Sequence, residues 1–278
     1  MIFKDPRQLK DTIKNKEKEL KLPANTLINY YMMDCFIERL YHSKYRKNFV
    51  IKGGFLISSL IGINMRSTMD IDTTVKGLAI DQNSIEKIIE EILSIELDDN
   101  INWHIEKIIN IHEIGEYEDF RVTLIANFFN MKVAVKIDIT TGDLIIPREI
   151  DYSYLPIFSD EEIYLKAYPI TSILAEKIES ILARNILNTR ARDYYDVYTL
   201  LKLNPTLDMD KLLEAVKAKA KERETLDYFI NRNIYIDAIK ESEDLRNIWK
   251  NYQRKNEYAK NISWEEILAS IETFRYKT

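Results

Sequence analysis

Three aspartates have a spacing that suits metal-dependent phosphoryl chemistry. Asp70 and Asp72 are two residues apart, so on an extended strand both carboxylates project from the same face. Asp138 lies in the segment 133–139, where every odd residue is apolar and Asp138 faces the other way. On a neighbouring strand, it would lie beside the other two. Hard cations such as Mg²⁺ prefer oxygen ligands and bind with substrate phosphates, so this set predicts a metal site for phosphoryl or nucleotidyl transfer.

A glycine turn precedes the aspartate pair. The short apolar strand 49–51 is followed by a tight turn at Lys52, Gly53 and Gly54 and then by an apolar helix start. Backbone N–H groups at a helix N-terminus bind anions, so the turn predicts a contact with a triphosphate. A plain tight turn is the alternative interpretation. The order of the parts is the informative feature: glycine turn, helix, strand with Asp-x-Asp, and a later strand with one aspartate.

A second group of charged residues lies in the later part of the sequence. Lys177 and Arg184 are seven residues apart, so they share a face of the predicted helix 170–187, beside an apolar stripe. Lys177 would neutralise a nucleotide phosphate, and pairing with a nearby acidic residue is the structural alternative. Asp193 and Asp196 share a face of the next helix and could hold Lys177 or a substrate group.

These motifs together resemble the AbiEii/AbiGii toxin family of the nucleotidyltransferase superfamily, which is related to the mycobacterial MenT toxins. The resemblance rests on residues 52–72 and on a lysine helix followed by an Arg-Asp-x-x-Asp helix in residues 174–197. Gly54 is followed by Phe55, where many nucleotidyltransferases carry serine, so phosphate contact is expected from backbone N–H groups and not from a serine side chain.

The resemblance implies two sets of site residues. The catalytic set is Asp70, Asp72, Asp138, Lys177 and Asp193, and its first three members are the metal ligands. The set that binds nucleotide or phosphate is Lys52, Gly53, Gly54, Arg66, Ser67, Thr68, Arg184, Arg190 and Asp196.

The function implied by the resemblance is nucleotidyl transfer with Mg²⁺, two ions of it, as cofactor. The donor would be GTP or a pyrimidine nucleoside triphosphate, and the first acceptor to expect is the 3′ end of tRNA. The biological setting would be a type IV toxin–antitoxin or phage abortive-infection system, with a cognate AbiEi-like antitoxin as functional partner. Two alternatives stay open: a transferase acting on a protein or a small molecule, and a non-catalytic nucleotide-binding protein.

The elements around these residues predict an α+β (α/β) fold. The expected strands after the turn are 66–75, 101–111, 122–129 and 133–139, and the expected helices in this half are 6–20, 23–45 and 84–95. After Pro169 the pattern is helical: 170–187, 190–203, 209–223, 237–258 and 264–274. We therefore expect a nucleotidyltransferase-type mixed sheet flanked by helices in a domain of residues 1–160, and a helical domain, 161–278, that completes the active-site cleft.

Composition limits the other possibilities. The 278 residues are 46% hydrophobic and 31% charged, with six glycines and six prolines, which favours regular elements over long loops. The single cysteine, Cys35, excludes an internal disulfide framework and a cysteine-rich zinc module. No apolar run suits a membrane span or an export signal, so the expected location is cytoplasmic. The net charge of −5 argues against a surface that binds nucleic acid everywhere, although the helical half is slightly basic.

Overall fold

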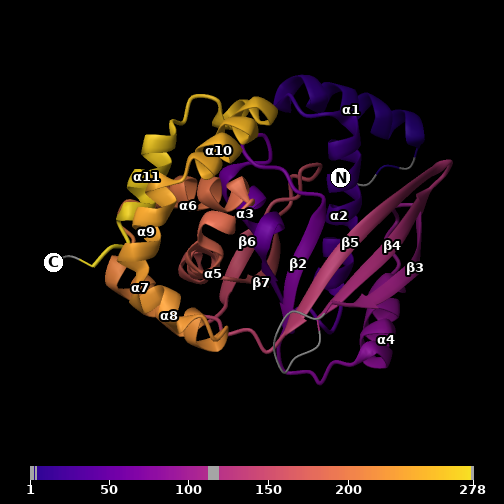
Figure 1. Cartoon of the computed structure of the whole chain (residues 1–278). Helices are drawn as coiled ribbons and strands as arrows, with labels where there is room; N and C mark the ends of the chain where they lie inside the picture. The colour runs from indigo at the N-terminus through magenta and orange to yellow at the C-terminus, as the bar shows by residue number, and fades with distance from the viewer. Residues whose placement is uncertain (1–2, 4, 112–118, 277–278) are drawn as a thin grey trace. The chain divides into compact units, whose positions relative to one another are not determined.

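The computed structural model of the chain describes residue 3, residues 5–111 and residues 119–276. It divides into two compact units, of which unit 1 comprises Met1–Asp143 and Glu149–Tyr168, and unit 2 comprises Leu144–Arg148 and Pro169–Thr278. Figure 1 shows the course of the chain from its N-terminus to its C-terminus. The predicted domains, 1–160 and 161–278, stay a prediction.

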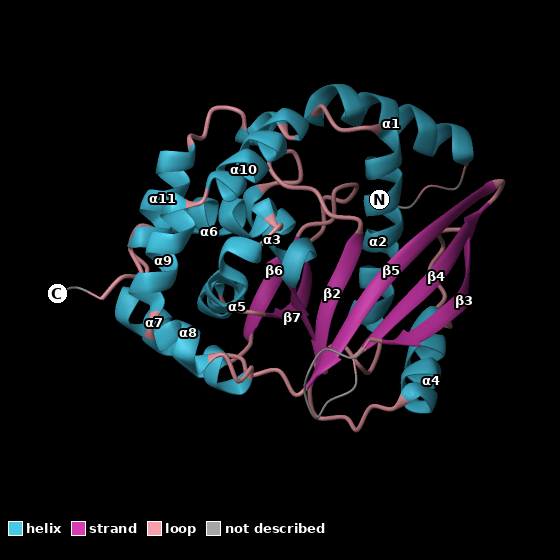
Figure 2. Ribbon diagram, viewed as in Figure 1, coloured by secondary structure: helices cyan, strands magenta, loops and turns pink. Residues whose placement is uncertain are grey.

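Unit 1 contains a mixed sheet, which has seven strands among the described residues (Figure 2). In spatial order they are β3 (Ile101–Asn110), β4 (Phe120–Phe128), β5 (Met131–Thr141), β2 (Asp70–Val75), β1 (Phe49–Lys52), β7 (Ile163–Ala167) and β6 (Ile150–Tyr154). Two neighbouring pairs are parallel, β2 with β5 and β1 with β7, and the other pairs are antiparallel. The predicted mixed sheet flanked by helices is confirmed.

Four helices accompany the sheet in the described part of unit 1. They are α1 (Pro6–Leu20), α2 (Ala24–His42), α3 (Gly53–Ile61) and α4 (Gln82–Leu93). The start of α1 follows the prediction, because the Asp5 side chain accepts a hydrogen bond from the Arg7 N–H and proline begins the helix. Helix α2 passes behind the sheet in Figure 1, where it packs on β5 and β7, and α4 packs on β3.

The core of unit 1 fixes which way each side chain of β5 points. Val135, Ile137 and Ile139 are fully buried, whereas Asp138 lies on the opposite face of the strand, as the alternation predicts. Fully burying an Ile or Val side chain stabilises a fold by roughly 1.5–3 kcal/mol. A register slip of one residue would exchange the two faces and bury charged groups. The apolar face therefore holds Asp138 on the polar face.

Two expectations for unit 1 need correction. The strand predicted for 66–75 begins only at Asp70, because hydrogen bonds to α3 and α2 hold the preceding loop. The Arg66 guanidinium donates to the Gly54 carbonyl, and the Thr68 N–H donates to the Tyr30 hydroxyl. Strands β6 and β7 were not predicted. Each has only five residues, and β6, at the sheet edge, is mostly exposed, so neither shows a strong pattern.

Unit 2 is helical in its described part, as predicted. Its helices are α5 (Ile170–Arg184), α6 (Ala191–Leu203), α7 (Met209–Glu222), α8 (Leu226–Ile230), α9 (Arg232–Glu241), α10 (Glu243–Lys255) and α11 (Trp264–Glu272). The single helix predicted for 237–258 is wrong: the chain breaks at Ser242, whose hydroxyl accepts from the Leu245 N–H and so caps α10. The short α8 was not predicted. None of the described helices in either unit has the length and apolar character needed to cross a bilayer.

Candidate active site

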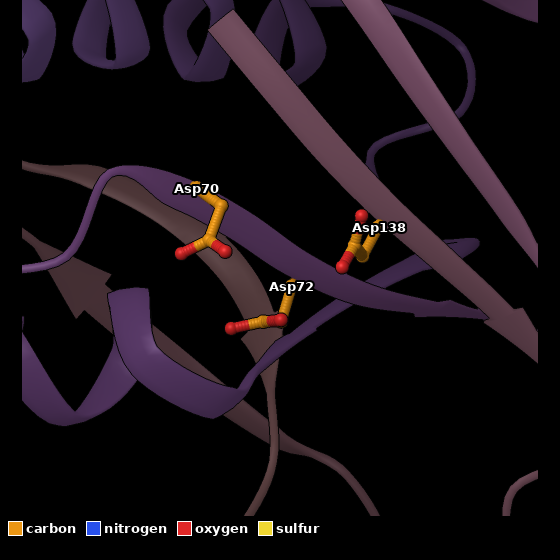
Figure 3. A group of neighbouring side chains, drawn as sticks. All are labelled: Asp70, Asp72 and Asp138. Carbon is orange, nitrogen blue, oxygen red and sulfur yellow. The ribbon is translucent and has the colours of Figure 1, made fainter. Parts of the chain in front are cut away.

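Three aspartates converge on the polar face of the unit 1 sheet. Asp70 and Asp72 lie on β2, and Asp138 lies on β5, where it is the direct register partner of Asp72. Each of the three offers a carboxylate oxygen, and these oxygens lie within 4.8 Å of one another. Figure 3 shows the three side chains gathered over the two strands. Parallel pairing of β2 with β5 thus brings together residues that are 66 to 68 positions apart.

Local hydrogen bonds orient two of the three carboxylates. The Gly54 N–H, in the first turn of α3, donates to Asp72 Oδ2 at 2.7 Å. The Thr68 hydroxyl donates to Asp70 Oδ1 at 2.5 Å. Bonds of this kind to a carboxylate are stronger than those between neutral groups, and a helix N-terminus adds a favourable partial positive charge. The loop before β2 and the start of α3 therefore fix the positions of both carboxylates.

The two glycines allow α3 to approach Asp72 this closely. Gly53 has φ +56, a conformation that L side chains rarely adopt, and a Cβ atom there would lie 2.3 Å from Asp72 Oδ2. A Cβ atom on Gly54 would lie 2.6 Å from an Arg66 guanidinium nitrogen. In this structure the Gly54 N–H is donated to a carboxylate. The contact of this turn with phosphate stays a prediction.

The electrostatics of the triad fit a divalent cation. The pKa of Asp72 is raised to about 6, first by burial and then by the neighbouring Asp70 and Asp138 carboxylates, while the Gly54 N–H and Lys52 act in the opposite direction. Negative charges held this close repel one another unless a cation lies between them. Mg²⁺ prefers oxygen ligands, which this set supplies. The three carboxylates therefore fit Mg²⁺ by donor type, spacing and charge.

Arg121 is a fourth charged residue beside the triad, and it was not predicted from the sequence. It lies on β4 directly opposite Asp138, with Nε 2.7 Å from Oδ1 and Nη2 2.6 Å from Oδ2. The signal was present in the hairpin, because only residues 129 and 130 separate β4 from β5. A loop this short fixes the antiparallel register, which pairs Phe128 with Met131 and so places Arg121 opposite Asp138.

The predicted phosphate-binding residues of unit 1 lie on β1 and in the loop before β2, and they differ in how far they are buried. Lys52 is the register partner of Asp72 on β1, and its Nζ lies 2.5 Å from Asp143 Oδ2. Asp143 also accepts from the Thr140 hydroxyl. Arg66 is buried and donates to the Gly54 carbonyl at 3.0 Å. Ser67 is half-buried in the same loop. These contacts show how the loop and the strand ends are held together, and phosphate binding by these residues stays a prediction.

The predicted site residues of unit 2 form a cluster of their own. Lys177 Nζ on α5 lies 2.5 Å from Asp193 Oδ1 and 3.4 Å from Asp196 Oδ2, both on α6. The Asp193 and Asp196 carboxylates are buried, whereas the Lys177 side chain is one-fifth exposed. Arg184 and Arg190 are exposed, at the end of α5 and at the N-cap of α6. The structure thus brings Lys177 together with the two aspartates and leaves both arginines outside this cluster.

Comparison with known proteins gives a family and a fold. A family model described as "Nucleotidyl transferase AbiEii toxin, Type IV TA system" matches residues 35–270. No curated protein matches the chain. Among solved structures, the chain is similar to an H. pylori protein assigned as a nucleotidyltransferase, with 15% identity and a TM-score of 0.50 over 91% of this chain and 96% of that chain. It is also similar to JHP933 from Helicobacter pylori, with 17% identity and a TM-score of 0.50 over 91% and 93%.

Proposed function

Since the chain belongs to the AbiEii nucleotidyl transferase toxin family of type IV toxin–antitoxin systems, we propose that it transfers a nucleotide to the 3′ end of tRNA, using Mg²⁺. One observation carries the catalytic part of this proposal. Three carboxylates, from two neighbouring parallel strands, offer oxygens within 4.8 Å of one another. Such a set is what a metal-dependent transferase of nucleotides needs.

The reaction is an in-line displacement at the α-phosphorus of a nucleoside triphosphate. The acceptor hydroxyl oxygen forms the new bond to phosphorus, the bond from the α-phosphorus to the bridging oxygen breaks, and pyrophosphate leaves. The hydroxyl proton passes to a carboxylate of the triad, and we assign Asp138 as this proton acceptor. GTP or a pyrimidine nucleoside triphosphate is the proposed donor.

The residues have distinct proposed roles. Asp70 and Asp72 would hold two Mg²⁺ ions, and Asp138 would complete one of the sites. When bound, Mg²⁺ offsets the charge of the triphosphate and acidifies the attacking hydroxyl. The residues proposed to bind nucleotide or phosphate are Lys52, Gly53, Gly54, Arg66, Ser67, Thr68, Arg184, Arg190 and Asp196. In unit 2, Lys177 neutralises charge on the nucleotide and Asp193 orients Lys177, in agreement with their ion pair of 2.5 Å.

The acceptor is proposed as tRNA because the helical part of the chain is slightly basic, although the chain as a whole has a net charge of −5. Phosphate contacts need clustered Lys and Arg, which a local excess can supply. Membership of a type IV toxin–antitoxin family implies an antitoxin as functional partner. A protein or a small molecule as acceptor remains the competing proposal.

The test uses one isosteric variant and one matched control. Asp70→Asn keeps an oxygen to accept the hydrogen bond of Thr68 but removes the charge of a metal ligand. Asp151→Asn removes the same charge from an exposed site on β6. Each protein is incubated with Mg²⁺, total bacterial tRNA and each α-labelled nucleoside triphosphate in turn, and the RNA is resolved on a gel.

We expect label on tRNA with the wild type and Asp151→Asn, and roughly 100-fold less with Asp70→Asn. The labelled nucleotide that gives product identifies the donor. If the wild type binds nucleotide with Mg²⁺ but labels no RNA, tRNA as acceptor is wrong, and proteins and small molecules become the acceptors to screen.

A further inference from the structure

Arg121 holds Asp138 by a two-pronged ion pair. Its Nε and Nη2 donate to the two oxygens of the Asp138 carboxylate at 2.7 and 2.6 Å. This parallel fork is the strongest geometry available to an arginine and a carboxylate, and it uses one lone pair on each oxygen. Because the two residues are register partners on β4 and β5, the backbone holds them opposite each other.

Arg121 interacts electrostatically with the other two carboxylates of the triad as well as with Asp138. The carboxylate of Asp138 raises the pKa of Arg121 most strongly, and Asp70 and Asp72 raise it further. The guanidinium therefore lies within the field of all three carboxylates. Its side chain is 39% exposed, against 22% for Asp138, so the guanidinium is more accessible to solvent than the carboxylate it holds. An arginine remains protonated at any physiological pH, so it can leave the triad only by moving away.

From this geometry we propose that Arg121 and a divalent cation compete for Asp138, so that metal binding releases the guanidinium to bind phosphate oxygens of the nucleotide. This inference rests on the proposed function and adds a residue to it. Arg121 is then the resident counter-ion of the triad in the metal-free protein. It is a positioning residue in that state, and a phosphate ligand in the loaded state.

Physical chemistry gives the direction of each step. A divalent ion at Asp138 brings twice the positive charge of a guanidinium and would repel a guanidinium bound to the same oxygens. The metal must displace two hydrogen bonds to a charged group, so we expect the ion pair of Arg121 to weaken metal binding by about tenfold. Once released, the planar fork matches the geometry of phosphate as well as it matches a carboxylate. The donor triphosphate supplies such oxygens.

The first measurement is calorimetric titration of the full chain with Mn²⁺ alone, without nucleotide. Arg121→Gln removes the positive charge and the fork, and Arg121→Lys keeps the charge but cannot form the fork. Lys132→Gln, at the exposed start of β5, the strand of Asp138, removes one positive charge as the matched control. We expect Arg121→Gln to bind Mn²⁺ about tenfold more tightly than the wild type, Arg121→Lys to be intermediate, and Lys132→Gln to be unchanged. Circular dichroism melting confirms that each variant is folded.

The second measurement is the affinity for a non-hydrolysable nucleoside triphosphate analogue at saturating Mn²⁺. Here Arg121→Gln should bind about tenfold more weakly than the wild type and Lys132→Gln. Equal or weaker Mn²⁺ binding by Arg121→Gln overturns the competition, and unchanged affinity for the analogue overturns the release to phosphate. Asp70→Asn separates these failures from that of the proposed function: if neither the wild type nor Arg121→Gln binds Mn²⁺ in an Asp70-dependent way, the metal site itself is wrong.

Discussion

Asp72 and Asp138 lie directly opposite each other on the parallel strands β2 and β5, so two carboxylates share one register position of the sheet. Such a placement is unfavourable for stability, because like charges on directly opposed residues repel. A cation bound between the two carboxylates would offset this repulsion, so the placement fits a site that binds a cation. Proteins commonly keep destabilising charges where function needs them.

Removing one of these charges should separate stability from activity. We expect Asp138→Asn to lower nucleotidyl transfer by roughly 100-fold, because a metal ligand is lost. Asp72→Asn should do the same, yet in metal-free buffer its unfolding temperature should equal or exceed that of the wild type, since a crowded charge has gone. Thermal melting with and without Mg²⁺ measures the stability, and labelling of tRNA measures the transfer activity. A clear loss of stability in metal-free Asp72→Asn would contradict the idea that the charge is kept for function.

The same two aspartates should act as one unit. If both serve one metal site, the double variant Asp72→Asn/Asp138→Asn should be no slower than the slower single variant. The initial rates of all four proteins test this. Losses that multiply would mean that the two carboxylates act independently.

Gly53 should tolerate no side chain, for two separable reasons. Gly53→Ala places Cβ 2.3 Å from Asp72 Oδ2 in a backbone with φ +56. Gly77→Ala is the matched control: it has φ +74, but its Cβ would lie 3.6 Å from its nearest neighbour, the Asn48 amide nitrogen. We expect about 1–2 kcal/mol of destabilisation at Gly77 from the backbone alone, and more at Gly53.

Activity distinguishes the two glycines further. Gly53→Ala must displace Asp72, so its transfer rate should fall strongly, whereas Gly77→Ala should keep its rate once folded. Urea unfolding and rate measurements at a temperature where both variants are folded give the comparison. Equal rates for the two variants would refute the view that the glycine turn positions Asp72.

Lys177 is expected to support both the fold and the reaction. Lys177→Met would leave the buried Asp193 and Asp196 carboxylates without its charge, which should cost about 3 kcal/mol of unfolding free energy. Lys217→Met, at an exposed position of α7, should cost little. Lys177→Arg keeps the charge and should stay folded. A folded Lys177→Arg variant with about tenfold lower activity would support the role of Lys177 in transfer, and full activity would oppose it.

The stability of the chain should carry a pH signature from Asp34. Burial raises the pKa of this carboxyl from 3.8 to about 7, although hydrogen bonds from the Tyr154 hydroxyl and the Ile157 N–H lower it. Between these two values the folded chain holds a proton that the unfolded chain has lost. The unfolding free energy contributed by Asp34 therefore falls as pH rises from about 4 to 7, by up to roughly 1.4 kcal/mol per pH unit, and then levels off.

Comparison of two variants isolates this contribution. Asp34→Asn cannot titrate, so its stability should lose less than that of the wild type as pH rises through the window. Asp160→Asn, at an exposed position, should follow the wild type. Urea unfolding at half-unit steps from pH 4.5 to 8 measures the slopes. Identical slopes for Asp34→Asn and the wild type would show that Asp34 is ionised throughout.

Local patterns in the sequence were sufficient to predict much of the triad. The spacing of Asp70 and Asp72 and the alternation around Asp138 each assign a side chain to one face of a strand. These patterns do not show that β2 and β5 are neighbours in the sheet, because their parallel pairing depends on packing between distant segments. The family resemblance supplied that step.

The residues that escaped prediction are those whose partners are distant in sequence or whose signal lies in a turn. Asp143 is one of them: it pairs with Lys52, 91 residues away, and no local pattern indicates this partner. Arg121 could have been found, because the two-residue hairpin before β5 determines its partner. Ser242 ended a predicted helix because its capping bond competes with helical continuity, which periodicity alone does not reveal.

The most direct test of the central claim is which phosphate of the donor reaches the acceptor. The wild type is incubated with Mg²⁺ and tRNA in two parallel reactions, in which the same nucleoside triphosphate is labelled either at the α- or at the γ-phosphate. Nucleotidyl transfer predicts acceptor label from the α-labelled donor only, with labelled pyrophosphate released from the γ-labelled donor, and loss of both with Asp70→Asn. Acceptor label from the γ-labelled donor would show phosphate transfer instead and contradict the account.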